Sequence, residues 1–373
     1  MKIAHITNNY TPYSGGVVSS IRAFSRQFLK NGHDLRIITL DFLGSQHEDP
    51  EYVLRVPSLV RFDRNNNKMA VPWRAGRVIE RFLDDFNPDV VHLHHPFLLC
   101  QKGLKIARKR KIPVVFTYHS IYERYAHYVP FYQPLVQYAV KRKVLRFCGT
   151  VDHIIAPSTF IQHYLLSQGI KTPISVIPSP LQDMFLGNVV INRSKTEKFR
   201  LLLVSRLVKE KSVEYLLEIV SKLPPERFLF TIVGYGAHEA ELRYYAYKTL
   251  KLKDSQVQFV IKPPKEQLLK YYCEADLFLF SSTSDTQGLV LAEAMAGGTP
   301  VVAVDGPGQR DIIKQGENGF IVDSQKEMLQ KIKQIADNDD LFAKLRKCSI
   351  ATANTYSPQQ RTKQVVQIYE KLT

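Results

Sequence analysis

The stretch from Ala275 to Gly308, ADLFLFSSTSDTQGLVLAEAMAGGTPVVAVDGPG, contains the pattern that decides the fold. The apolar run 276–280 is followed by two serines, as expected of a buried parallel strand that ends in a loop. Apolar residues at helical spacing follow Gly288, a pair of glycines ends that helix, and a second apolar run covers 301–304. Strand, loop, helix and strand form a βαβ unit, so the sequence predicts an α/β fold with parallel sheets.

The loop between the first strand and the helix is expected to bind a ligand, because ligands of open α/β sheets sit beyond the carboxyl ends of the strands. The carboxylates of Asp285 and Glu293 can accept pairs of hydroxyl groups. The amides of Gly288 and Leu289 at the helix start attract phosphate. A sugar carrying a phosphate is the implied ligand, and the alternative is an ordinary amphipathic helix with an exposed glutamate.

The length of 373 residues exceeds that of a usual single domain. Alternating strands and helices occur on both sides of a polar stretch at 187–198, which is typical of a linker. The sequence therefore predicts two Rossmann-like domains, at 1–182 and 195–356. A C-terminal helix at 357–373 is expected to pack back on the N-terminal domain.

The net charge is +16, of which +11 falls within residues 1–185. This excess calls for an anionic partner, and nucleic acid, an anionic membrane and a phosphorylated substrate all fit it. No motif typical of nucleic-acid binding accompanies the charge. No apolar run is long enough to span a bilayer and no signal peptide is recognised, so a cytosolic or peripheral protein is expected. The four scattered cysteines predict free thiols.

Three features of the N-terminal half are candidates for a site. Gly15 and Gly16 lie between a strand and a helix, where backbone amides approach a phosphate closely. The loop is not GxGxxG, which argues against an NAD-linked oxidoreductase. His119 follows the strand 113–117 and is a candidate polar group, with a structural role as the alternative. His94 and His95 are neighbours whose side chains point to opposite faces, so site-lining or structural roles are favoured over a metal site.

The segment 122–147 is aromatic and basic, whereas 42–68 shows no clear periodicity. Apolar residues at helical spacing beside a cationic face suit a helix at a membrane interface, and a core-facing helix with a solvated basic side is the alternative. The candidate membrane or acceptor residues are Tyr122, Tyr125, Tyr128, Lys141, Arg142, Lys143 and Arg146.

Two cations follow the first strand of the C-terminal half. Arg206 ends this strand and Lys211 comes after a turn, an arrangement that suits a diphosphate clamp, although a solvated loop would show the same charges. Gly234 begins a turn after the strand 228–233.

Taken in order, these features resemble the retaining nucleotide-sugar glycosyltransferases of family 4, which have the GT-B fold. The resemblance covers nearly the whole chain and rests on motifs at 15–16, 119, 157–158, 205–211, 234–236 and 285–302. It implies two Rossmann-like domains facing each other across a cleft that holds the nucleotide sugar. It also implies transfer with retention, without a metal ion, a further cofactor or a protein nucleophile.

The resemblance assigns a role to each candidate donor residue. Arg206 and Lys211 would hold the diphosphate together with amides near Gly16 and Leu289, and Glu293 would hold the ribose. Asp285 and His119 would contact the transferred sugar. The catalytic set implied in this way is His119, Arg206, Lys211 and Asp285. The donor-binding set is Gly15, Gly16, Arg206, Lys211, Gly234, Asp285, Gly288, Leu289 and Glu293.

A narrower likeness concerns the acceptor. The segments 91–97, 117–128 and 286–289 look like those of bacterial diacylglycerol α-glucosyltransferases, which implies UDP-glucose as donor and a membrane lipid as acceptor. It further implies a cytoplasmic enzyme that is peripheral on the inner face of the cell membrane. The family usually has Glu where this chain has Asp285, and its usual glycines are absent at 179–180 and 262–263. A soluble or cell-envelope saccharide acceptor and a non-catalytic sugar-nucleotide or membrane-binding protein are the alternatives.

Overall fold

The computed structural model describes residues 1–12, 15–42, 49–64, 67–123, 133–186 and 198–373. The chain divides into two compact units. Unit 1 comprises Met1–Pro180 and Pro358–Thr373, and unit 2 comprises Leu181–Ser357. The predicted linker lies outside the described residues except for Lys198.

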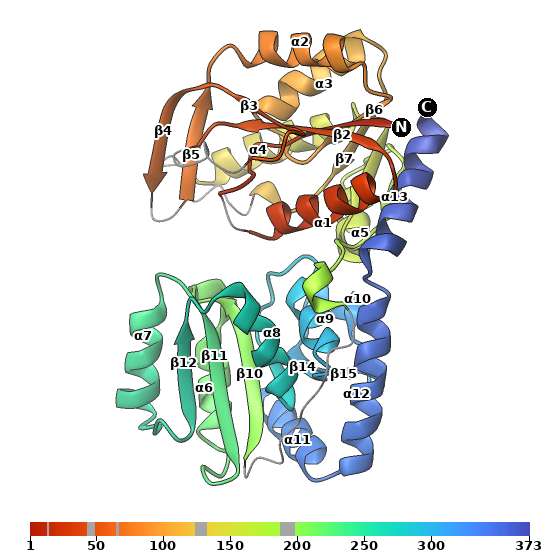
Figure 1. Cartoon of the computed structure of the whole chain (residues 1–373). Coiled ribbons are helices and arrows are strands. Elements are labelled where there is room, and N and C mark those ends of the chain that lie inside the picture. The colour runs from red at the N-terminus through yellow and green to blue at the C-terminus, as the bar shows by residue number, and fades with distance from the viewer. Residues whose placement is uncertain (13–14, 43–48, 65–66, 124–132, 187–197) are drawn as a thin grey trace. The chain divides into compact units, whose positions relative to one another are not determined.

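Unit 1 is built on a seven-stranded parallel sheet with the order β3-β2-β1-β6-β7-β8-β9 (Figure 1). Its strands are β1 Lys2–Ile6, β2 Asp34–Leu40, β3 Val53–Val56, β6 Val90–Leu93, β7 Val114–Thr117, β8 His153–Ala156 and β9 Ile174–Val176. Its helices are α1 Gly16–Lys30, α2 Ala75–Phe86, α3 Leu99–Lys109, α4 Gln133–Cys148, α5 Thr159–Ser167 and α13 Pro358–Leu372.

Different helices pack against the two faces of this sheet. Ala4, Ile6 and Val91 pack in one cluster with residues of α2 to α5. Ile3 and Val90 pack in another cluster with residues of α1 and α13. Because side chains alternate along a strand, a sheet with both faces covered explains why the central strands are continuous apolar runs.

The last helix, α13, belongs to unit 1, which confirms the predicted return of the C-terminal helix to the N-terminal domain. The ring of Tyr369 stacks on that of Phe28 in α1, with centroids 5.8 Å apart. The Tyr369 hydroxyl lies 2.6 Å from Nδ1 of His92 in the sheet. The final turn of the chain is therefore part of the unit 1 core.

An antiparallel hairpin occupies a region for which the sequence predicted no regular structure. Its strands are β4 Ser58–Arg64 and β5 Asn67–Pro72 (Figure 1). Leu59 and Val60 are both exposed, at 63% and 48%. Apolar side chains thus occur in succession on β4 without being buried. The period-two pattern by which a half-buried strand is recognised is lost.

Unit 2 has a six-stranded parallel sheet with the order β12-β11-β10-β13-β14-β15. The strands are β10 Phe199–Arg206, β11 Phe228–Tyr235, β12 Val257–Ile261, β13 Leu277–Phe280, β14 Val301–Val304 and β15 Gly319–Val322. The α-helices are α6 Val213–Val220, α7 Glu239–Tyr244, α8 Lys265–Glu274, α9 Leu289–Ala296, α10 Pro307–Ile312, α11 Gln325–Ala336 and α12 Asp339–Asn354. The two parallel sheets with their helices confirm the predicted α/β class.

One glycine of unit 2 sets the spacing of two strands. Gly234 lies opposite Ser205 in the β10–β11 register, and a Cβ at Gly234 would stand 1.8 Å from the Ser205 carbonyl oxygen. We expect Gly234→Ala to lower the free energy of unfolding by about 2–4 kcal/mol, because two strands of the central sheet must separate. Gly76→Ala in α2 is the control, since its Cβ would meet nothing within 4 Å. Urea unfolding of both variants checks this, and equal midpoints would contradict it.

Candidate functional site

Each sheet has one point at which the strand order reverses. In unit 2 the chain runs from β10 to β11 and β12 and then adds β13 on the other side of β10. In unit 1, β6 is added beside β1 after β2 and β3 in the same way. Ligands of open α/β sheets bind at the carboxyl ends of strands at such points. Ligand binding is therefore expected at the loops after β10 and β13 in unit 2, and at those after β1 and β6 in unit 1.

In unit 2 the structure brings together two predicted site residues from the loops after β10 and β13. Lys211 ends the short 3₁₀ helix η3 Lys209–Lys211, and Asp285 lies between β13 and α9. The Nζ of Lys211 is 2.6 Å from Oδ2 of Asp285, and the two side chains are 10% and 28% exposed. The Ser281 hydroxyl donates to the Lys211 carbonyl oxygen at 2.8 Å and joins the two loops. The cation predicted to bind phosphate and the carboxylate predicted to bind hydroxyl groups thus form one ion pair.

Arg206 is the last residue of β10 and is exposed. It lies opposite Tyr235 at the end of β11, one position beyond Gly234. Because all strands of the sheet run parallel, Arg206 and the Lys211–Asp285 pair share one edge of the sheet. These three predicted residues thus bring two cations and one carboxylate to this edge.

The start of α9 lies at the same edge. Gly288 caps this helix in the left-handed conformation, with φ of +66°. A Cβ at Gly308 would stand 2.6 Å from the Gly288 nitrogen, so the two backbones touch. The amide of Gly308 donates to the Asp285 carbonyl oxygen at 2.9 Å and holds the loop against the helix start. First-turn amides have no acceptor within their own helix, and they attract anions. The sequence did not single out Gly308.

Glu293 lies on α9, and a tyrosine from α8 holds it. The hydroxyl of the fully buried Tyr272 donates to Oε2 of Glu293 at 2.9 Å. Burial, together with the Glu293 carboxylate, raises the pKa of Tyr272 well above its usual value, so the phenol remains a donor. Tyr272 was missed because a core aromatic on a helix gives no sign in the sequence of a partner 21 residues away.

In unit 1 the predicted residue His119 is part of a group of histidines. Its Nε2 is 3.1 Å from Nδ1 of His94, and Nε2 of His94 is 3.3 Å from Nδ1 of His5. His92 stacks on His94 with centroids 4.4 Å apart, and its two nitrogens meet the Tyr369 hydroxyl and Thr117 Oγ1. Burial lowers the pKa of His5 and of His119 to about 3 and takes those of His92 and His94 well below the usual value. The rings are therefore neutral at pH 7.

The ligand atoms of His5, His92 and His94 lie within 4.8 Å of one another, close enough to suggest a metal site. Both nitrogens of His92 already have hydrogen-bond partners, and both nitrogens of His94 face other imidazoles. The stacked rings of His92 and His94 lie within 26° of parallel, so their in-plane lone pairs do not converge on one point between the rings. This arrangement is that of a hydrogen-bonded network.

The neighbouring residue His95 has a separate role. Its Nδ1 accepts a hydrogen bond from the Asn8 amide at 3.3 Å. The Asn8 side chain in turn donates to the Phe97 carbonyl oxygen and accepts from the Leu99 amide, both at 3.1 Å. His95 thus fixes the loop after β1 to the loop after β6.

The predicted glycine loop leads into α1. Gly15 caps the helix with an extended backbone, and its carbonyl oxygen accepts from the Ser19 amide at 3.0 Å. A Cβ at Gly16 would meet nothing within 4 Å, so packing does not require a glycine there. An open approach to the first-turn amides is compatible with a phosphate.

The candidate membrane residues are partly described. Arg142, Lys143 and Arg146 are exposed on α4, and Lys141 is half-buried. Leu135 and Tyr138 on the same helix are exposed, at 65% and 62%. Tyr122 is half-buried, with its ring edge-on to that of Phe97. Tyr125 and Tyr128 lie outside the described residues. Among the described helices, none is both long and apolar enough to cross a bilayer.

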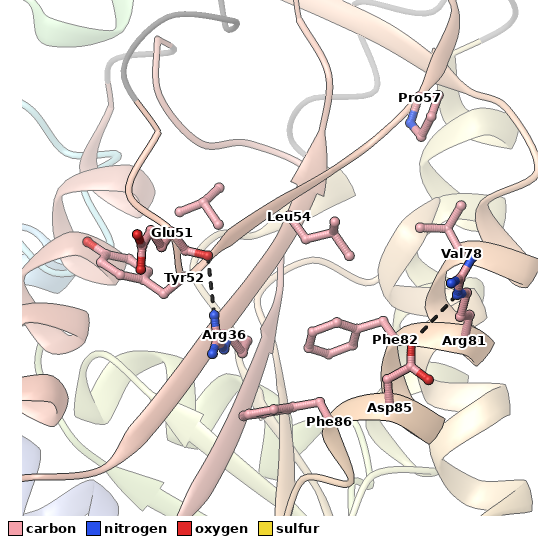
Figure 2. Close-up of a pocket in the computed structure, with 11 residues that line it drawn as sticks. Arg36, Glu51, Tyr52, Leu54, Pro57, Val78, Arg81, Phe82, Asp85 and Phe86 are labelled. Carbon is pink, nitrogen blue, oxygen red and sulfur yellow. Dashed lines mark hydrogen bonds and ion pairs between the residues drawn. The ribbon is translucent and has the colours of Figure 1, made fainter.

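A cavity of about 640 Å³ in unit 1 lies apart from these residues. It is lined by Arg36 of β2, by residues between 51 and 57 and by one face of α2, from Val78 to Phe86. None of the predicted site residues lines it. Figure 2 shows Arg36 with the Glu51 carbonyl oxygen at one side and the Arg81–Asp85 pair at the other. None of the histidines described above lines this cavity.

The family assignment follows from comparison of the chain with known domains. Residues 14–182 match the model of Glycosyltransferase Family 4, and residues 188–353 match that of Glycosyl transferases group 1. The chain belongs to these glycosyltransferases. The two matches fall on the two halves of the chain whose sheets carry the sites described above.

Relatives of this glycosyltransferase include two bacterial lipid glucosyltransferases. The alpha-monoglucosyldiacylglycerol synthase of Streptococcus pneumoniae is 29% identical, over 84% of this chain and 73% of the relative. The enzyme of the same name from Acholeplasma laidlawii is 25% identical, over 99% of this chain and 96% of the relative. Anabaena Alr3699/HepE in complex with UDP has a similar structure, with a TM-score of 0.77 and 18% identity over the full length of both chains. These likenesses confirm the predicted family and the GT-B fold.

Proposed function

We propose that this glycosyltransferase moves glucose from UDP-glucose to a membrane lipid, such as diacylglycerol, with retention of configuration at the anomeric carbon. The observation that carries the proposal is the unit 2 edge where Arg206, the Lys211–Asp285 pair and the start of α9 lie together. Two relatives named as alpha-monoglucosyldiacylglycerol synthases support the choice of sugar and acceptor.

The chemistry of the donor follows from the charges at this edge. Cleavage of the sugar–phosphate bond leaves UDP with an additional negative charge. Arg206, Lys211 and the first-turn amides of α9 would stabilise this charge without a metal ion. Asp285, held by Lys211, would accept hydrogen bonds from hydroxyl groups of the glucose, and His119 would contact the same sugar. Retention would require no protein nucleophile if a phosphate oxygen of the donor takes the proton of the attacking hydroxyl.

The acceptor half rests on the composition of α4. Exposed Leu135 and Tyr138 precede the exposed cations Arg142, Lys143 and Arg146 on this helix. Such a helix can place apolar groups at the headgroup level while its cations meet anionic lipid. We propose that the enzyme acts as a peripheral protein on the inner face of the cell membrane, with an anionic bilayer surface and no nucleic acid as its partner.

Radiolabelled UDP-glucose with diacylglycerol in anionic vesicles tests this function. A chloroform-soluble glucolipid is expected, with an α linkage in its NMR spectrum and an unchanged rate in excess chelator. If product formed only with a water-soluble saccharide, the proposed lipid acceptor would be wrong. If UDP bound but no sugar were transferred to any acceptor, the protein would have a binding role and not a catalytic one. If chelator abolished the activity and Mg²⁺ restored it, the proposal that transfer needs no metal ion would be wrong.

The proposed ribose contact gives a prediction for Glu293. We expect Glu293→Ala to weaken UDP binding by roughly 10- to 100-fold, because a carboxylate that accepts two ribose hydroxyls is lost. Tyr272→Phe removes only the donor that holds the carboxylate, and a smaller loss of roughly threefold to tenfold is expected. Isothermal titration with UDP measures both variants. Unchanged UDP affinity in Glu293→Ala would rule out the ribose contact.

The proposed membrane contact gives a prediction for α4. Changing Arg142, Lys143 and Arg146 to Gln should weaken binding to anionic vesicles by roughly 100-fold, since each basic residue near such a surface contributes about 1 kcal/mol. The control changes three exposed lysines of α3, Lys102, Lys105 and Lys109, and so removes the same charge. Vesicle co-sedimentation should separate the two variants while their UDP affinities stay equal. Equal loss in both would point to net charge alone.

A further inference from the structure

A line of three imidazoles runs from inside unit 1 to the loop after β7. His5 lies on β1, His94 follows β6 and His119 follows β7, and these three strands are neighbours in the sheet. Nδ1 of His5 faces Nε2 of His94 at 3.3 Å, and Nδ1 of His94 faces Nε2 of His119 at 3.1 Å. Each ring thus uses one nitrogen toward each neighbour.

A neutral imidazole has one N–H and one bare nitrogen, so the proton positions along this line are coupled. If His94 carries its proton on Nδ1, it donates to Nε2 of His119 and accepts from Nδ1 of His5. If His94 carries it on Nε2, both hydrogen bonds reverse. Only these two arrangements satisfy both contacts, and they place opposite tautomers at His119.

The inner end of the line distinguishes the two arrangements. Nε2 of His5 is buried and has no hydrogen-bond partner among the described residues. In the reversed arrangement this atom would be an N–H donor without an acceptor, which is rare in protein interiors. The ring of Phe28 stands at 86° to that of His5 and offers at most a weak N–H···π contact. In the first arrangement the unpartnered atom is a bare nitrogen, and the N–H groups of His5 and His94 each have an acceptor in the next ring.

We infer that His5 and His94 are positioning residues that hold His119 in its Nδ1–H tautomer. The Nε2 lone pair of His119 then accepts from His94, so this nitrogen is unable to act as a base toward a substrate. Nδ1 carries the proton in this tautomer and has the character of a hydrogen-bond donor, which suits an oxygen of the transferred sugar. That last role rests on the proposed function, whereas the tautomer itself does not.

The tautomer can be measured in the ligand-free enzyme. Protein labelled with ¹⁵N-histidine gives two-bond N–H correlations that show which ring nitrogen carries the proton. His119, His94 and His5 should all be protonated on Nδ1. His95 is the internal standard with the proton on Nε2, because its Nδ1 accepts from the Asn8 amide. Protonation of His119 on Nε2, or a stoichiometric metal ion bound at His5, His92 and His94, would overturn the inference.

Two substitutions at His94 separate positioning from packing. His94→Asn keeps an N–H donor near the position of Nδ1, and His94→Leu replaces it with an apolar group of similar size. We expect His119 to stay protonated on Nδ1 in His94→Asn and to gain the Nε2–H form in His94→Leu. The kcat for glucosyl transfer should fall roughly tenfold in His94→Leu and less than threefold in His94→Asn, with UDP affinity unchanged in both. Equal tautomers in the two variants would contradict the inference, even if UDP-glucose proved not to be the donor.

Discussion

Replacing Lys211 with Met should lower kcat for glucosyl transfer by roughly 100- to 1,000-fold, the usual effect of removing one group that stabilises charge in a transition state. The Lys211 side chain is only 10% exposed, and its Nζ lies 2.6 Å from Oδ2 of Asp285. It would act on two parts of the donor at once. Its charge would stabilise the departing diphosphate, and its contact with Asp285 would orient the carboxylate toward the sugar. Steady-state kinetics with UDP-glucose and a lipid acceptor measure the loss.

Lys209→Met is the matched control, because it removes the same group from an exposed position on the same 3₁₀ helix. Its kcat should remain within about twofold of that of the unchanged enzyme. Lys211→Met also leaves Asp285 without its cation, so thermal unfolding must show that the variant is folded. The double variant Lys211→Met with Asp285→Asn restores charge balance. If it recovered full activity, Lys211 would serve only to neutralise Asp285, and its proposed action on the diphosphate would be wrong.

The sequence predicts the elements of this enzyme well where short-range patterns determine them. The strand, loop and helix around Asp285 and Glu293 occur as predicted, because buried parallel strands are continuous apolar runs and Gly288 marks the helix start. The hairpin formed by β4 and β5 was missed because its apolar residues do not alternate with burial. A strand is recognised in a sequence when its buried residues are apolar and its exposed residues are polar, and an exposed hairpin does not show this alternation.

Contacts between distant residues were beyond prediction from the pattern. Lys211 and Asp285 were assigned separate roles, and their ion pair spans 74 residues of sequence. The histidine network did leave a sign, since the sequence predicted a strand through His94, and His92 and His94, two residues apart on such a strand, would share a face. The adjacent pair His94 and His95 gives no such sign, because neighbouring side chains on a strand point to opposite faces. His5 gave no sign of its partner because it lies inside an apolar strand.

The buried histidines predict that unit 1 unfolds in mild acid. Burial lowers the pKa of His5 and of His119 to about 3 and that of His95 to about 4, and takes those of His92 and His94 well below the usual value. In the unfolded chain these groups titrate near 6.5. Below that pH the unfolded state binds more protons than the folded state, so stability is complete above about pH 6.5 and is lost as the pH falls. Each histidine removes about 1 kcal/mol between pH 6.5 and 5.5, where its unfolded form goes from half to nearly full protonation, and about 1.4 kcal/mol per pH unit below that range.

The five histidines together should remove about 5 kcal/mol between pH 6.5 and 5.5, which is comparable with the whole stability of a typical domain. Few carboxylates with ordinary pKa values take up protons in this range, so the histidines dominate the change. Trp73, the single tryptophan of the chain, lies in unit 1, and its fluorescence during urea unfolding follows that unit. Equal urea midpoints at pH 7.5 and 5.5 would show that the histidines are protonated or solvated in the folded state.

His95→Asn provides the matched control for this pH dependence. Its side-chain oxygen can still accept from the Asn8 amide, and the substitution leaves His5, His92 and His94 in place. The slope of unfolding free energy against pH should then fall by about a fifth, since one of five similar titrations is removed. A slope that fell to zero would mean that His95 alone is responsible. The same result would mean that the line from His5 to His119 is not the group of neutral rings on which the tautomer of His119 depends.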